Sequence, residues 1–406
     1  MDLKKALEDQ ATDWKRITKL KRIDLRELRL NVAVGSLTEA FARSADSIKQ
    51  ILSELVSGGM NFSNADPGHG LGHFVRDCLN AMRLADRLDA DPKDIFIGIL
   101  AGIFHDIGCA FVNRYDEPKR LIRHAEAAAL ILNGVFELNG CGLNQAEQLL
   151  VEYSVAAHTH YLKPTEFKFG GKIYVIEPYR DEENGKPILA VWLPRWIDRL
   201  ECNGPTFVAR HYLTLATPHK DFSGEEFFEV NFSKHLRPLL RTPEEIREVK
   251  KIDEKEGQTM LEHLNMFADS QTNLSPYGRH DYGAMVQMRE AQTARLTRII
   301  AASNAAFDGD KETVLRNWDL FLKRNIEPTE SGARTVTALN LAFSELPEAT
   351  QKAWISCFAA TLSEYRSWEA EVRVDLAQMH EQGFPRPEET LSEVADVLSM
   401  ISPAYR

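Results

Sequence analysis

The chain has 406 residues, and its 44% hydrophobic and 27% charged residues are typical of a globular protein, neither disordered nor fibrous. This length predicts a sizeable core with a second domain attached to it. The formal net charge of −11 excludes a general nucleic-acid or anionic-membrane binder, because such surfaces need an excess of Lys and Arg.

Apolar residues recur at three- and four-residue spacing through the first half of the chain, which predicts amphipathic helices. The first two helices, within residues 1–60, are expected to pack on the core, and the second ends at Gly58 and Gly59. A loop, "NADPGHGLGH", then leads into the next helix. In chain order, the helices are predicted over residues 2–30, 36–57, 73–88, 94–104, 120–133 and 144–159.

The pattern changes after residue 160. "FKFGGKIYVIE" alternates around a Gly-Gly pair and "KPILAVWL" is rich in strand-forming residues, so 166–193 is predicted to be a small β insert, with helix resuming at Arg195. Frequent Pro, Gly and charge over 216–280 indicate connecting elements. A C-terminal helical domain, 281–406, is predicted from periodic segments at 282–305, 310–324, 334–345 and 348–381. The predicted fold class is therefore mainly α.

No targeting or membrane segment is expected. The N-terminus is charged and amphipathic, without the apolar region of a secretory signal. The longest apolar run is far shorter than the ~20 residues that span a bilayer. Five cysteines lie far apart and include no CxxC pair, which is typical of a reducing compartment and of neither a disulfide framework nor a thiolate zinc site. We therefore expect a cytoplasmic protein that does not bind membranes.

The most apolar predicted helix ends in two ionisable side chains. "IFIGILAGIF" contains no polar side chain and runs directly into His105 and Asp106. Neighbouring residues on a helix point about 100° apart, so one apolar face cannot absorb both. Coordination to a cation removes the cost of burying a carboxylate. A second pair, His280-Asp281, has Gly and Pro nearby and no apolar helix before it, so we interpret it as a solvated loop.

Other candidate metal ligands accompany the first pair, and each has small or apolar neighbours on a predicted helix. They are His73 in "HGLGHFVRD", His124 in "RHAEAAALIL", His158 in "SVAAHTHY" and Asp198 in "RWIDRLE". Four histidines and two carboxylates can supply one or two metal ions with nitrogen and oxygen ligands. Imidazole ligation favours a divalent transition metal, Fe, Mn, Co, Ni or Zn, over Mg.

The order of these candidate ligands along the chain resembles that of the HD-domain superfamily, whose signature is H…HD…H…H…D on a bundle of helices. "HGLGHFVRD", "AGIFHDIG" and "WIDRLE" are similar to its opening, namesake and closing motifs, over about 65–205. The resemblance implies an HD domain at 61–215 that contains the β insert. It also implies that His73, His105, Asp106 and Asp198 form the basic metal site, that His124 and His158 serve a second metal, and that Asp106 bridges the two.

Several polar residues near these motifs are candidates for contact with a substrate. His69 lies among glycines in a loop and is expected on the substrate side or in a structural role. The candidate catalytic residues are Asp106, His69 and Lys163. Charged residues in and before the β insert are either solvated or part of a flap over the metals, and Arg76 either contacts phosphate or forms a buried salt bridge. The candidate substrate-binding residues are Arg76, His160, Lys168, Lys172 and Arg180.

Three functions are compatible with this site. Two metals held in this way activate water and stabilise a phosphoryl transition state, so the leading interpretation is a metal-dependent phosphohydrolase whose substrate is a nucleotide or another small phosphate ester. The chain contains no GxxxxGK[ST] or GxSxG motif, which excludes the commonest P-loop and α/β-hydrolase alternatives. The same six ligands fit the di-iron oxygenase branch that includes myo-inositol oxygenase. The third function is a regulatory module that only binds ligand, and a homo-oligomer is left open.

Overall fold

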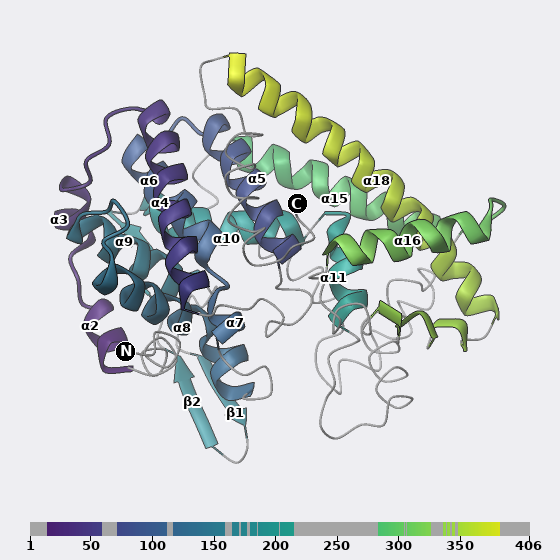
Figure 1. Cartoon of the computed structure of the whole chain (residues 1–406), viewed down its shortest axis with the longest axis horizontal. Helices are drawn as coiled ribbons and strands as arrows, with labels where there is room; N and C mark the ends of the chain where they lie inside the picture. Colours follow the sequence, from purple (N-terminus) through teal and green to yellow (C-terminus); the bar gives the residue numbers. More distant parts are fainter. Residues whose placement is uncertain are drawn as a thin grey trace. The chain divides into compact units, whose positions relative to one another are not determined.

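The chain is mainly helical over the residues that the structure describes (Figure 1), which confirms the predicted fold class. The computed structural model describes residues 14–58, 71–111, 117–158, 165–169, 172–176, 179–184, 186–202, 204–214, 283–303, 305, 307–325, 336–337, 339–341, 343–345 and 348–381. The chain divides into two compact units: Met1–Asp198 with Val372–Arg406 forms unit 1, and Arg199–Glu371 forms unit 2. The predicted connecting segment, 216–280, lies outside the described residues.

Unit 1 contains helices at the predicted places in the first half of the chain, but the prediction of one helix over 2–30 is wrong, because residues 21–24 separate α2 from α3 and 1–13 lie outside the described residues. The helices are α2 (Trp14–Leu20), α3 (Leu25–Leu30), α4 (Leu37–Ser57), α5 (Leu71–Arg87), α6 (Pro92–Phe104), α7 (Gly108–Phe111), α8 (Glu117–Leu138), α9 (Gln145–Ala156) and α10 (Leu189–Cys202), whose last residues belong to unit 2. Side chains at the helix starts satisfy free N–H groups: Ser36 caps α4, Asp91 caps α6, and Asn144 caps α9 in a capping box with Glu147.

The apolar helix α6 lies at the centre of unit 1. Every residue from Asp94 to Phe104 is buried, and α6 contacts α4, α5 and α9. Helix α8 packs on both α9 and α7. A helix with neighbours on several sides needs no polar face, which explains the uninterrupted apolar run.

The predicted β insert is only partly confirmed. β1 (Thr165–Phe169) pairs antiparallel with β2 (Lys172–Ile176), and the two-residue strands β3 (Glu182–Glu183) and β4 (Lys186–Pro187) form a second ladder. The prediction of strand through residue 193 is wrong, because Leu189–Leu193 is the start of α10. These five residues are all buried, so their apolar run carries no helical period, and periodicity alone cannot distinguish such a helix from a buried strand.

Unit 2 is built around an aromatic core. Its described helices are α11 (Thr206–Thr214), α15 (Gly283–Ser303), α16 (Lys311–Asn325) and α18 (Glu348–Glu381), which continues into unit 1. Residues 336–337, 339–341 and 343–344 are also helical. Trp318 and Phe358 stack with ring centroids 4.2 Å apart, and Tyr212 and Trp354 pack beside them. Among the described residues, no helix combines the length and apolar character that crossing a membrane requires.

Candidate metal centre

Both candidate ligands after the apolar run lie just outside the helix. α6 ends at Phe104, and residues 105–107 form a turn before α7 begins at Gly108. The N–H of Ile107 donates to the carbonyl oxygen of Phe104 at 3.3 Å. His105 keeps helical backbone angles, but the hydrogen bonds here join residues three apart, so the regular ladder of α6 ends at this pair. The buried helix α6 therefore places this pair near the centre of unit 1.

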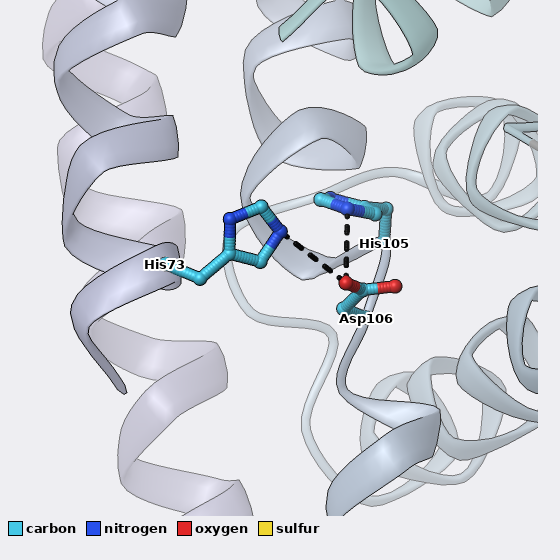
Figure 2. Close-up of side chains that lie close together, drawn as sticks. All are labelled: His73, His105 and Asp106. Carbon is cyan, nitrogen blue, oxygen red and sulfur yellow. Dashed lines mark ion pairs between the residues drawn. The ribbon is translucent and has the colours of Figure 1, made fainter. Parts of the chain in front are cut away.

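Figure 2 shows His73, His105 and Asp106 pointing toward one another. Nε2 of His73 and Nε2 of His105 each lie 3.3 Å from Oδ2 of Asp106, and both rings are buried. Oδ1 of Asp198 lies 3.7 Å from Nε2 of His73 and 3.9 Å from Nε2 of His105. Helix α5, the turn after α6, and helix α10 therefore bring four of the predicted ligands together.

His124 and His158 form a second group with the same aspartate. Their Nε2 atoms lie 3.5 and 3.7 Å from Oδ1 of Asp106 and 3.2 Å from each other. The predicted helix over 144–159 is too long, because α9 ends at Ala156 and His158 follows its cap residue, Ala157. His124 comes from α8, so elements far apart in sequence supply this group.

Asp106 divides its two carboxylate oxygens between the two groups. Oδ2 faces His73 and His105, whereas Oδ1 faces His124 and His158. Two ligands of one ion, with bonds of about 2.0–2.2 Å at about 90–110°, lie about 2.8–3.6 Å apart. The separations of 3.3–3.7 Å between Asp106 and the four ring nitrogens are within or next to this range. The donor set fits two cations that share Asp106.

Main-chain carbonyls fix the orientation of two of the imidazoles. Nδ1 of His105 donates to the carbonyl oxygen of Gly102 at 2.7 Å, and Nδ1 of His158 donates to that of Val155 at 2.8 Å. A carbonyl oxygen only accepts, so Nδ1 carries the hydrogen and the neutral ring keeps its lone pair on Nε2. In both rings, Nε2 is the atom that faces Asp106. This is how proteins prepare histidines for metal ligation.

The charges in the two groups differ. Burial lowers the pKa of His105, but the negative charges of Asp106, Asp77 and Asp198 outweigh it and raise the pKa to about 10. Burial and the positive charges of His105 and His124 lower the pKa of His158 well below its ordinary value. At neutral pH the metal-free first group therefore holds a protonated His105 among carboxylates, and a cation bound there would replace the proton on Nε2, whereas the second group offers a neutral imidazole.

Glycines lie where the elements of the site approach closely. A Cβ atom at Gly108 would lie 2.2 Å from the carbonyl oxygen of His124 and 2.8 Å from the nitrogen of Ala128, so only glycine lets α7 lie this close to α8. A Cβ atom at Gly102 would lie 2.5 Å from Cδ1 of Ile197, which precedes Asp198 on α10. Gly108 thus helps to place Asp106 beside His124, whereas the end of the Ile197 side chain could rotate away from a Cβ atom at Gly102.

A buried arginine ties the last two ligand segments together. Nε of Arg195 donates to the carbonyl oxygen of Ala157 at 2.8 Å, next to His158, and its Nη1 donates to Oδ2 of Asp181 at 2.6 Å. Arg195 is on α10, one turn before Asp198. This contact of the guanidinium group fixes the end of α9 against the helix that carries Asp198.

The structure describes only some of the predicted substrate residues. His69, His160 and Lys163 lie outside the described residues, and of Lys168 and Lys172 only the strand positions are described. Arg76 is buried on α5. Arg180 is half-exposed, and its guanidinium lies 3.9 Å from Glu183 at the surface, while its carbonyl accepts a hydrogen bond from Tyr153.

Sequence reasoning missed one carboxylate of the cluster. Asp77 is buried one turn after His73 on α5, and its Oδ2 lies 3.1 Å from Nε2 of His73. The i, i+4 spacing of "HFVRD" places both side chains on one helix face, and this spacing is the signal that could have identified it. The contact between Arg195 and Asp181 carries no comparable signal, because Asp181 lies in a segment without regular periodicity.

Comparisons with models of known families, with curated proteins and with solved structures find no match.

Proposed function

We propose that the chain is an HD-domain metal-dependent phosphohydrolase that cleaves a phosphate ester or phosphodiester of a nucleotide or a related small molecule. The observation that carries the proposal is the position of Asp106, whose two oxygens face two different histidine pairs. The order of the motifs along the chain supports the same family. Two divalent cations supply Lewis acidity and an activated water molecule for phosphoryl transfer.

The described residues have distinct roles in this proposal. His73, His105 and Asp198 hold one cation, His124 and His158 hold the other, and Asp106 fixes the spacing between them. The hydrogen bonds from His105 and His158 to main-chain carbonyls keep the rings oriented before the cations bind. Contacts between the substrate and His69, His160, Lys163, Lys168, Lys172 or Arg180 remain predictions.

One observation favours a second candidate, a di-iron oxygenase. The group of Asp106, His124 and His158 consists of one carboxylate and two imidazoles, the ligand combination of many non-haem Fe(II) oxygenases. A fourth ligand from the chain in this group would have weakened this alternative, and no other described residue belongs to it.

Turnover with and without oxygen distinguishes the two candidates. The protein is purified without added metal, its metals are identified by elemental analysis, and it is assayed with nucleoside phosphates and aryl phosphate esters. The phosphohydrolase proposal predicts equal release of phosphate or nucleoside monophosphate in air and under anaerobic conditions. Strict dependence on O₂ and reduced iron, without cleavage of any phosphate ester, would assign the oxygenase function instead.

A further inference from the structure

Three carboxylates converge on one imidazole nitrogen in the first metal group. Oδ2 of Asp77, Oδ2 of Asp106 and Oδ1 of Asp198 lie 3.1, 3.3 and 3.7 Å from Nε2 of His73. A ring nitrogen carries one hydrogen or one lone pair, so it can satisfy one of these oxygens by a hydrogen bond and not all three. A multivalent cation beside Nε2 interacts favourably with all three.

We infer that Asp77 binds the same cation as His73, as a third carboxylate ligand beside Asp106 and Asp198. This inference rests on the proposed dinuclear site and adds a ligand that the HD motif does not contain. The separation of 3.1 Å between Asp77 and His73 lies within the range of about 2.8–3.6 Å for two ligands of one ion. Only 1% of the Asp77 side chain is exposed, so water does little to stabilise its charge.

The position of Asp77 on α5 makes this ligation compatible with the fold. His73 and Asp77 are one turn apart, so α5 presents both to the same site without distortion. Oδ2 of Asp77 also lies 4.0 Å from Nδ1 of His105. That nitrogen of His105 donates to the carbonyl oxygen of Gly102, so the contact that places Asp77 at the proposed cation is the one with Nε2 of His73.

A third carboxylate makes the two cation sites unequal. The cation beside His73 has two imidazoles and three carboxylates as ligands, one of which is shared, whereas the cation beside His124 has two imidazoles and the shared carboxylate. Because a larger negative charge and more ligands strengthen cation binding, the first site is filled at a lower metal concentration. Asp77→Asn should therefore weaken the first binding event specifically.

The test is a calorimetric titration of metal-free protein with Mn²⁺, in wild type and in Asp77→Asn. Asparagine conserves the shape of the side chain and removes its charge. We expect the affinity for the first equivalent of Mn²⁺ to fall by about 10-fold or more. The matched control is Asp94→Asn, which removes a buried carboxylate that pairs with Arg29 in the same unit; it should lower stability and leave the first Mn²⁺ affinity unchanged.

The opposite result has a clear physical meaning. If Asp77 only accepts a hydrogen bond from Nε2–H of His73, it stabilises the protonated ring against the metal, and Asp77→Asn would bind the first Mn²⁺ with equal or higher affinity. That outcome would overturn the inference. A wild-type chain that binds no metal would instead refute the proposed function.

Discussion

Gly108→Ala tests whether the close approach of α7 to α8 positions the second group of candidate ligands, Asp106, His124 and His158. The added Cβ atom would lie 2.2 Å from the carbonyl oxygen of His124, 2.8 Å from the nitrogen of Ala128 and 3.2 Å from the carbonyl carbon of His124. These are main-chain atoms of α8, so no side chain can rotate away. Relief of the clash to an ordinary contact requires α7 and α8 to separate by about 1 Å.

That displacement is large compared with the tolerance of a metal site. Nε2 of His124 lies 3.5 Å from Oδ1 of Asp106, and a further shift of about 1 Å moves this pair beyond the roughly 2.8–3.6 Å that two ligands of one ion allow. We expect Gly108→Ala to keep the metal held by His73 and His105 and to lose the second one. Overpacking of this kind also costs about 1–3 kcal/mol of stability.

Metal stoichiometry by elemental analysis and a thermal melt measure the two effects. The control is Gly35→Ala, because the nearest atom to a Cβ there is a side-chain oxygen of Glu39 at 3.5 Å, an ordinary contact. This control should bind two metals and melt like wild type. A Gly108→Ala protein with two metals and an unchanged melting temperature would refute the role assigned to the close approach.

Other predictions concern single side chains. Asp106→Asn should weaken both metals and abolish turnover, whereas Asp281→Asn, at the second His-Asp pair, should change little; equal effects would show that the motif is misread. Arg195→Lys should lower the affinity for the second metal about 10-fold, because lysine cannot donate to both the carbonyl oxygen of Ala157 and the carboxylate of Asp181. An unchanged metal affinity would contradict this. Burial raises the pKa of Glu152 to about 7 from 4.5, so the folded chain holds this proton more tightly than the unfolded chain. Arg16, which pairs with this carboxylate at 2.9 Å, opposes the shift. The free energy of unfolding should therefore fall as the pH rises through this window, and urea titrations of Glu152→Gln should lack that decrease.

Regular helices with clear ends were predictable from the sequence. The segments 36–57 and 348–381 correspond to α4 (Leu37–Ser57) and α18 (Glu348–Glu381). A side-chain cap at Ser36 and a glycine stop at Gly58 define α4. Local chemistry of this kind depends on neighbours in the chain, so a single sequence contains it.

The sequence-based predictions were wrong or incomplete where burial or tertiary contacts determine the structure. Leu189–Leu193 is buried on all sides, so its composition resembles that of a strand although it forms helix. The residue types and order of the ligands were predictable, and the structure brings the six together. The division of the Asp106 oxygens, the contacts of Arg195 and the nearness of Asp77 depend on how α5, α8 and α10 pack, which no local pattern encodes.

The most direct test of the central claim is a Mn²⁺ titration of the metal-free full chain followed by electron paramagnetic resonance. Two ions that share the carboxylate of Asp106 are close enough for their spins to couple. We predict two Mn²⁺ per chain, with the signal of the coupled pair at full occupancy. A single bound ion, or two ions with the spectra of isolated Mn²⁺, would contradict an Asp106-bridged metal centre.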